Sequence, residues 1–164
     1  MAKTDDDLAL PARSLLLGIM GGARSMAPFA MLALNHDRKS LRGAWRDWPV
    51  FNSQVGRGVL VAAALGEIVG DKLPNTPSRL SPGPLVGRVV SQAVAGSALG
   101  STYGGTRRVV EGAAFGAAGG LIGSYVGYLF RVKTTEATGL PDAVIALIED
   151  AITIATVAVV IAAD

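Results

Sequence analysis

Five apolar runs, separated by short polar connectors, divide this chain. The runs cover residues 14–34, 58–70, 85–103, 109–130 and 140–162. A helix that crosses a bilayer needs about 20 mainly apolar residues. Four runs meet this length, and the second, with 13 residues, needs its neighbours at 55–57 or 72–73 to complete a span. The pattern predicts an all-α fold, a polytopic integral membrane bundle of four to five transmembrane helices that forms one domain over 1–164.

The first apolar run carries several residues that interrupt helices. Gly21 and Gly22 weaken a helix through their conformational freedom, and Pro28 has no N–H to donate to the carbonyl of Arg24. We therefore expect a first helix that is broken near Gly21 to Pro28, with its non-helical part beside an ionised Arg24. The alternative is a simple proline kink, with Arg24 snorkelling toward the membrane surface.

The polar connector over residues 35–54 has an apolar row and a basic row at helical spacing. The apolar row is Leu41, Trp45 and Trp48, and the basic row is Arg38, Arg42 and Arg46. Tryptophan favours the headgroup region of a bilayer and arginine favours anionic lipid, so the connector is predicted to be an interfacial amphipathic helix. The alternative is an ordinary solvated loop.

Glycine recurs every fourth residue in the third and fourth runs. The longest rows are Gly112, Gly116 and Gly120 and, on a second face, Gly119, Gly123 and Gly127. Rows of small residues let two helix backbones approach closely, which is the main route to helix packing inside lipid. We expect both rows to serve helix packing rather than ligand binding.

The composition agrees with a membrane protein and argues against several kinds of site. Of the 164 residues, 50% are hydrophobic and 17% are charged, against roughly 25% charged residues in soluble domains. With no cysteine and a single histidine, any bound metal would need oxygen ligands, and its identity is left open.

The net charge of +2 is mild, and the basic residues are not interleaved with aromatic ones, so no nucleic acid is expected as a partner. Because no phosphate loop, nucleophile elbow or H-E-x-x-H motif occurs, we expect neither an enzyme nor a cofactor.

Four carboxylates stand inside or at the mouth of the apolar runs, namely Glu67, Asp71, Glu149 and Asp150. A charge near the centre of a spanning helix costs roughly 2.5 to 3.5 kcal/mol, so such residues usually serve function and face a partner or a wet cavity. Glu67 and Asp71 share one helix face and predict a paired oxygen site for a hard cation or a shared proton. Glu149 would lie near the bilayer midplane, and Asp150, turned by about 100°, would face a neighbouring helix or a second subunit.

Several short motifs resemble those of a known family. They are G-A-R-S at 22–25, G-E-I-V-G-D-K-L-P at 66–74, Arg88, and P-D-x-x-x-A-L-I-E-D at 141–150. From Leu15 to Val160 the chain resembles an uncharacterised family of small bacterial integral membrane proteins, known as a domain of unknown function. It departs from that family at Gly70, where alanine is usual, and in lacking an aromatic, histidine-containing loop after Pro74. The resemblance implies no substrate, but it implies a polytopic membrane protein whose recurring polar positions are Arg24, Glu67, Asp71, Lys72, Glu149 and Asp150.

These features predict a small channel or secondary transporter for an ion or small solute, as a multi-pass protein of the inner (plasma) membrane. Glu67, Asp71 and Glu149 would bind a proton or cation, and Arg24 would attract an anion or fix the broken helix. The alternative is a non-transporting accessory or structural protein that packs against a larger membrane complex or binds lipid. Glu67 would then form an ion pair with Arg24, and Asp71 with Lys72 would cap a helix. Besides the lipid bilayer, we expect a homo-oligomer or a larger membrane complex as partner, because five short spans make a thin bundle.

Overall fold

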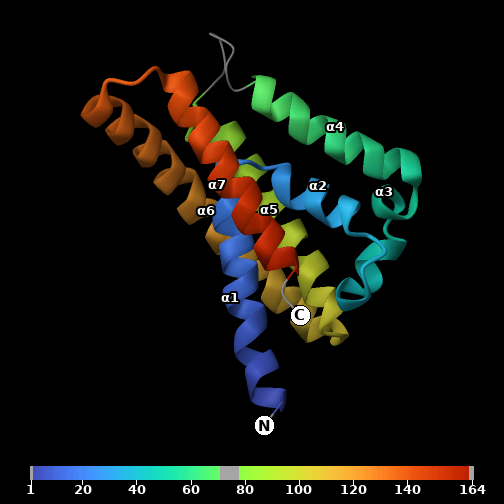
Figure 1. The fold of residues 1–164 in the computed structure, drawn as a ribbon. Coiled ribbons are helices and arrows are strands. Elements are labelled where there is room, and N and C mark those ends of the chain that lie inside the picture. Colours follow the sequence, from blue (N-terminus) through green and yellow to red (C-terminus); the bar gives the residue numbers. More distant parts are fainter. Residues whose placement is uncertain (1, 71–77, 163–164) are drawn as a thin grey trace.

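The computed structural model describes residues 2–70 and 78–162, and every regular element in these ranges is a helix (Figure 1). The α-helices are α1 (Ala2–Ala23), α2 (Ala27–Leu34), α3 (Pro49–Asn52), α4 (Gln54–Gly70), α5 (Pro82–Thr102), α6 (Gly105–Thr138) and α7 (Asp142–Ala162). Two 3₁₀ turns, η1 (Lys39–Leu41) and η2 (Ala44–Asp47), lie between α2 and α3. The all-α fold expected from the sequence is confirmed for this part of the chain.

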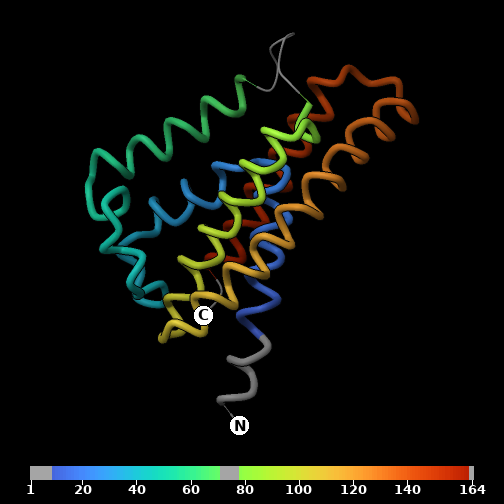
Figure 2. The backbone as a smooth tube through the Cα atoms, turned by 180° about the vertical axis from the view of Figure 1, so that it is seen from behind, coloured from blue at the N-terminus to red at the C-terminus, as the bar shows by residue number. Residues whose placement is uncertain are grey.

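Three helices form the centre of the bundle. The helices α1, α5 and α6 pack against one another, and α7 packs against α1 and α6. The short helix α2 contacts both α4 and α7. Figures 1 and 2 show α4 and α6 on opposite sides of the molecule. Because α4 packs mainly on α2 and α3, most of its surface is uncovered, and Leu60 is its buried residue.

The two glycine rows of α6 face two different helices. A Cβ built on Gly112 would lie 2.2 Å from the carbonyl oxygen of Gly96 in α5, and one on Gly123 would lie 1.9 Å from that of Ile19 in α1. Both distances are far below van der Waals contact, so a side chain at either position would push two helices apart. Gly116 and Gly120 also face α5, and Gly119 also faces α1.

The first apolar run is interrupted, as the sequence predicts. The helix α1 ends at Ala23 and α2 begins at Ala27, and the residues between them are not helical. Pro28 lies in the first turn of α2, where backbone N–H groups have no helical partner and a missing one costs little. The proline therefore starts a second helix and does not kink a continuous one.

Residues 35–54 do not form the single amphipathic helix predicted for them. They form η1, η2 and the short helix α3. Trp45, expected at a membrane surface, is fully buried, and its ring packs edge-on against Phe51 with a centroid distance of 4.8 Å. Gly43, between η1 and η2, is extended and not helical, and its backbone lies so close to Ser101 of α5 that a Cβ would be 2.8 Å from the Ser101 carbonyl carbon.

Two of the described helices, α6 with 34 residues and α7 with 21, are long and apolar enough to cross a membrane. Within their apolar stretches only 33% and 44% of the residues are buried, so most of this surface faces outward. Leu147, Ile148 and Ile152 of α7, for example, are exposed. The apolar part of α1, Ala9–Ala23, is shorter, and the four to five spans expected from the sequence stay a prediction.

Candidate functional site

The backbone between α1 and α2 presents two open helix ends. A helix leaves carbonyls without partners at its C-terminus and N–H groups without partners at its N-terminus. Here the carbonyls of Gly22 and Ala23 lie close to the N–H groups of Ser25 and Met26, and Arg24 between them is buried. Side chains from three other helices bind around this break.

Glu67 of α4 caps the start of α2. Its Oε1 accepts hydrogen bonds from the N–H and the hydroxyl of Ser25 at 2.9 and 2.8 Å, and its Oε2 accepts one from the N–H of Met26 at 2.9 Å. A carboxylate in this position is stabilised by the unpaired N–H groups and by the positive end of the helix dipole. Glu67 therefore connects α4 firmly to the break.

Arg88 of α5 caps the C-terminal end of α1, as Glu67 caps the start of α2. Its Nη1 donates to the carbonyl oxygens of Gly22 and Ala23, both at 3.0 Å, and its Nη2 lies 3.3 Å from Oε1 of Glu67. A cation at a helix C-terminus complements the negative end of the dipole. The sequence-based alternative paired Glu67 with Arg24. In the structure the Glu67 carboxylate pairs with Arg88, and Arg24 reaches the Glu67 backbone carbonyl at 3.4 Å.

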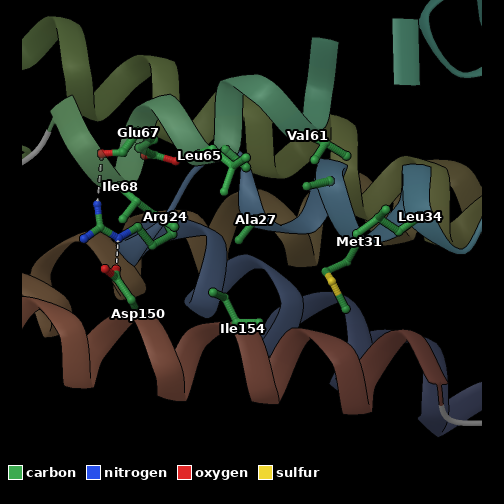
Figure 3. Close-up of a pocket in the computed structure, with 12 residues that line it drawn as sticks. Arg24, Ala27, Met31, Leu34, Val61, Leu65, Glu67, Ile68, Asp150 and Ile154 are labelled. Atoms are coloured by element: carbon green, nitrogen blue, oxygen red, sulfur yellow. Dashed lines mark hydrogen bonds and ion pairs between the residues drawn. The ribbon is translucent and has the colours of Figure 1, made fainter. Parts of the chain in front are cut away.

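Arg24 forms a second buried ion pair, with Asp150 of α7 (Figure 3). The Arg24 Nε donates to Oδ1 of Asp150, and the two residues are 2% and 5% exposed. Asp150 thus faces a neighbouring helix of the same chain, which is one of the two positions expected for it. The break between α1 and α2 is therefore connected to α7 as well as to α4 and α5.

A third buried pair joins Glu149 of α7 to Arg79. The Nη1 and Nη2 atoms of Arg79 donate to Oε1 and Oε2 of Glu149 at 2.8 and 3.2 Å, so the contact is bidentate. Both residues are buried. Gly127 of α6 makes room for the pair, because a Cβ there would lie 2.7 Å from Nη1 of Arg79 and 2.8 Å from Oε1 of Glu149. This glycine, predicted to pack helices, borders an ion pair.

Four of the polar positions singled out from the sequence lie in these pairs: Arg24, Glu67, Glu149 and Asp150. Asp71 and Lys72 lie outside the described residues. The cation or proton site predicted for Glu67 with Asp71 therefore stays a prediction.

Sequence reasoning left three residues out of the candidate site, Arg79, Arg88 and Gln92. Arg79 stands in a proline-rich turn and reads as a surface residue, and Arg88 was noted only among the motifs of the resemblance. Gln92 is fully buried, and its side-chain amide donates to the carbonyl of Ser25 at 3.1 Å. One signal was present, since four carboxylates stand among or beside the apolar runs, and the two cations singled out, Arg24 and Lys72, cannot balance all of them.

A pocket of about 160 Å³ runs between α4 and α7, over α2 (Figure 3). Its walls are mainly apolar, with Val61 and Leu65 from α4 and Ile154 from α7. The Arg24–Asp150 pair lies at one end. The pocket therefore leads along apolar side chains to the charged break.

The Arg79–Glu149 pair stands between two further hollows. On the Glu149 side, an apolar groove of about 190 Å³ lies between α1, α6 and α7, with Phe130 and Ile152 in its wall. On the Arg79 side, an open depression of about 540 Å³ is lined mostly by residues of polar type. Its other lining residues are Ser78, Tyr128, Arg131, Val132, Thr135, Glu136 and Asp142. The pair thus contributes one residue to the wall of each hollow.

Three arginine–carboxylate pairs balance the charges buried in this region. Taking such charges out of water is costly, and removing one partner leaves a charge whose burial costs about 3 to 5 kcal/mol. A proton on one carboxylate removes its negative charge and so weakens its attraction to the paired arginine. In the described residues no group of three or more His, Asp or Glu side chains is placed to hold a metal ion.

The chain matches no protein-family model, no curated protein and no solved structure. The resemblance to an uncharacterised membrane family remains a prediction from short motifs. Function must therefore be argued from the geometry of the three ion pairs and the hollows beside them.

Proposed function

We propose that this protein is a multi-pass protein of the inner membrane, with four to five spans, that works as a small secondary transporter or channel for an ion or small solute. The outward-facing apolar surface of α6 and α7 supports insertion into a bilayer. The ion pairs behind this surface support a transport site, because charges inside a membrane bundle are costly and usually functional.

The break between α1 and α2 carries the proposal. Non-helical backbone at membrane depth is tolerated where protein buries it or where it lines a cavity. Secondary transporters use such breaks to direct helix ends and charged groups at a substrate. Here the break is buried, Arg24 within it pairs with Asp150, and the pocket between α4 and α7 ends at that pair.

The ion pairs favour coupling between a proton and an anion over binding of a bare metal cation. Glu67, Glu149 and Asp150 each face an arginine already, so a cation would have to displace a guanidinium. A proton on the carboxylate instead weakens its attraction to the arginine, so that an anion can compete for a place beside that arginine. Because the proton and the anion bring opposite charges, the net charge inside the bundle does not change.

Transport is tested with the purified protein in liposomes that contain a pH-sensitive dye. A panel of small anions, with sodium and potassium as cations, is applied across a pH gradient. We expect proton movement that requires an anion. Glu149→Gln removes the proton site at nearly constant size and should abolish this coupled movement. Glu111→Gln is the matched control, because Glu111 is a half-buried acid near the opposite end of α6 and should leave the movement unchanged.

Two results would count against the proposal. Normal coupled flux in a folded Glu149→Gln variant would overturn the assignment of the site. No flux of any solute through the folded wild type would overturn transport itself and favour a second function.

That second function is a non-transporting accessory protein, and the glycines of α4 and α5 favour it. A Cβ on any of the outer glycines would meet nothing within 4 Å, whereas those in the rows of α6 would meet neighbouring helices. The outer glycines are Gly58, Gly66, Gly83 and Gly87. Small residues of this kind permit close helix contact in lipid, so a second copy or a larger membrane complex would fit this face.

The variants Gly66→Leu and Gly116→Leu separate assembly from folding. Because the surroundings of Gly66 are open, its variant should fold but assemble less, as measured by crosslinking in native membranes. A Cβ on Gly116 would lie 2.2 Å from the Gln92 carbonyl oxygen, so the Gly116→Leu variant should yield less folded protein than the wild type. Unchanged assembly of the Gly66 variant would argue against an interface on α4.

A further inference from the structure

Both ends of the first apolar run lie at the same end of the bundle. Arg13 of α1 donates to the carbonyl oxygen of Val160 at distances of 2.8 and 3.2 Å. Arg38, which follows α2 in the chain, donates to the carbonyl oxygen of Ala162 at 3.0 Å. Both carbonyls belong to the last turn of α7. The helices α1 and α2 therefore lead into the bundle and back to the end at which the run begins.

The loop between α5 and α6 lies at this end as well, beside the connector over residues 35–54 (Figure 2). The N–H of Trp45 in the connector donates to the hydroxyl of Ser101, near the end of α5, at 3.2 Å. A Cβ on Gly100 would lie 2.2 Å from the carbonyl oxygen of Arg108, near the start of α6. The connector and the first turn of α6 therefore both pack on the end of α5.

Basic side chains gather at this end, which we call the basic end. Its exposed members are Arg38, Lys39, Arg42 and Arg107, and Arg46 and Arg108 are half-buried. At the opposite end, within the described residues, Arg131 pairs with Asp142, and Lys133 is the exposed basic residue. Arg79 and Arg88 face carboxylates inside the bundle. The structure thus separates a basic end from an end with little exposed positive charge.

Acidic residues also occur at the basic end, but they are fewer. Asp37 and Asp47 are exposed on the connector, and Glu111 of α6 is paired with an arginine. The first turns of α1 bring Lys3 and three aspartates at residues 5–7 to the same end. Membrane orientation follows the number of lysines and arginines in short loops and depends little on acids. These acids therefore do not cancel the difference between the two ends.

The basic end borders exposed apolar surface. Leu34 and Val55 stand directly before and after the connector, and they are 66% and 77% exposed. On α6 the apolar surface begins with Val110, which is 62% exposed and follows Arg107 within one turn. Arginine and lysine at such a border extend their charged groups toward lipid headgroups while their stems lie along apolar surface. In a bilayer, the basic end would therefore lie at the level of the lipid phosphates.

We propose that the basic end binds anionic phospholipid headgroups and faces the cytoplasm. Each lysine or arginine close to the anionic lipids of the cytoplasmic leaflet strengthens binding about fivefold. Positively charged loops also stay on the cytoplasmic side during insertion. The first apolar run is then re-entrant, because α1 and α2 enter from the cytoplasm and return to it, with the break at Arg24 as the turning point. This inference rests on the membrane insertion proposed above and not on transport.

Single cysteines test the orientation, because the chain contains no cysteine of its own. Ser40→Cys lies on the connector and Ala137→Cys near the end of α6, and both positions are exposed. In intact spheroplasts of the expression host, a maleimide that does not cross membranes should label the Ala137 variant but not the Ser40 variant. Ala2→Cys, at the start of α1, should behave like Ser40→Cys because the run is re-entrant. After permeabilisation all three variants should react, and the wild type should not.

Two labelling results would overturn this inference. Reaction of Ser40→Cys in intact spheroplasts would refute the orientation. Opposite results for Ala2→Cys and Ser40→Cys would refute the re-entrant run.

Lipid binding is tested on the purified full-length protein in detergent, with dihexanoyl phosphatidylglycerol as probe and dihexanoyl phosphatidylcholine as the zwitterionic control. A ligand that binds only the folded state raises the Tm. We expect the phosphatidylglycerol to raise the Tm more than the phosphatidylcholine, and about 0.5 M sodium chloride to remove most of the difference, because salt screens exposed charges. An equal shift with inorganic phosphate would overturn lipid as the ligand. Equal shifts with the two lipids would do so too, and would favour an acidic protein partner at this end.

Variants assign the response to the basic end. The triple variant Lys39→Gln/Arg42→Gln/Arg107→Gln removes three exposed charges and should weaken binding of phosphatidylglycerol about a hundredfold. Lys39→Arg/Arg42→Lys/Arg107→Lys keeps the charges and should bind like the wild type. Lys133→Gln, at the opposite end, is the control and should also bind like the wild type. Unchanged binding by the triple glutamine variant would refute the assignment to this surface.

Flux in liposomes separates this inference from the proposed function. The expected labelling and lipid binding without flux of any solute would retain the basic end and overturn transport. Coupled flux through a protein with the opposite orientation would retain transport and overturn this inference. Recovery of the folded protein in the soluble fraction of the cell would overturn both.

Discussion

Glu67→Gln should be strongly destabilising although it only replaces one carboxylate oxygen by an NH₂ group. The carboxylate accepts the N–H groups of Ser25 and Met26 on its two oxygens and pairs with Arg88. A glutamine has one acceptor oxygen, and its NH₂ group would face a second N–H donor. The variant therefore loses one hydrogen bond at the start of α2 and the negative charge opposite Arg88.

Two losses set the magnitude. The Arg88 side chain is 11% exposed, and loss of the Glu67 charge beside it should cost about 3 kcal/mol. This is the lower end of the range for a broken buried pair, because the guanidinium keeps its bonds to the carbonyls of Gly22 and Ala23. The lost hydrogen bond adds about 1 kcal/mol. The sum of about 4 kcal/mol is a large part of the roughly 5 to 15 kcal/mol that stabilises a typical domain.

The assay is reversible unfolding of the purified protein in mixed micelles with a denaturing detergent. Glu111→Gln is the matched control, because the side chains of Arg108 and Glu111 are 23% and 25% exposed and such a pair contributes about 0 to 1 kcal/mol. The double variant Glu67→Gln/Arg88→Gln should lose less stability than the sum of the single variants, since it leaves no unbalanced charge. A cost no larger than that of the control, or simple additivity, would refute the role of this pair.

Two further predictions concern packing, and both use the free energy of unfolding. Gly116→Ala should cost about 1 to 3 kcal/mol, because its Cβ would lie 2.2 Å from the Gln92 carbonyl oxygen, whereas Gly87→Ala, in open space, should raise stability by up to about 1 kcal/mol. Equal effects would contradict the assignment of inner and outer glycines. Trp45→Ala should cost about 3 to 5 kcal/mol through loss of its packing on Phe51. A cost below about 1 kcal/mol would instead place this ring at a surface.

The positions of the helices could be predicted because turn-forming residues separate the apolar runs. The runs at 85–103 and 140–162 correspond to α5 and α7 within a few residues. The break in the first run could be predicted too, since glycines weaken a helix and Pro28 favours a new helix start. These helix and turn preferences depend on neighbouring residues in the sequence, so they can be predicted without knowledge of the tertiary contacts.

The partners of the carboxylates could not be predicted from the sequence. The alternative interpretation paired Glu67 with Arg24, but Arg24 pairs with Asp150, and Glu67 pairs with Arg88. Partner choice depends on how α5 and α7 are rotated about their axes, which is set by tertiary contacts. With 15 lysines and arginines in the chain, spacing alone does not select among them.

The connector over 35–54 shows a second limit. The spacing of Leu41 and Trp45 fits an amphipathic helix, but it also fits 3₁₀ turns that direct both side chains inward, and both are fully buried. The close contact of Gly43 with Ser101 of α5 is a tertiary contact, which the spacing of apolar residues does not reveal. A row of apolar residues thus predicts a common face, but not whether lipid or protein covers it.

The buried carboxylates differ in how firmly they are held, and this difference separates a structural pair from an exchangeable one. Glu67 accepts backbone and hydroxyl donors in addition to facing Arg88, so a proton there would disturb the start of α2 together with the ion pair. Within the described part of the chain, the Glu149 carboxylate is bonded through Arg79, and the open depression reaches that arginine. Protonation of Glu149 thus releases one side-chain contact, whereas protonation of Glu67 weakens a helix end. For a transport cycle in which a carboxylate gains and loses a proton, we therefore expect Glu149 to be the group that exchanges and Glu67 to keep the break in place.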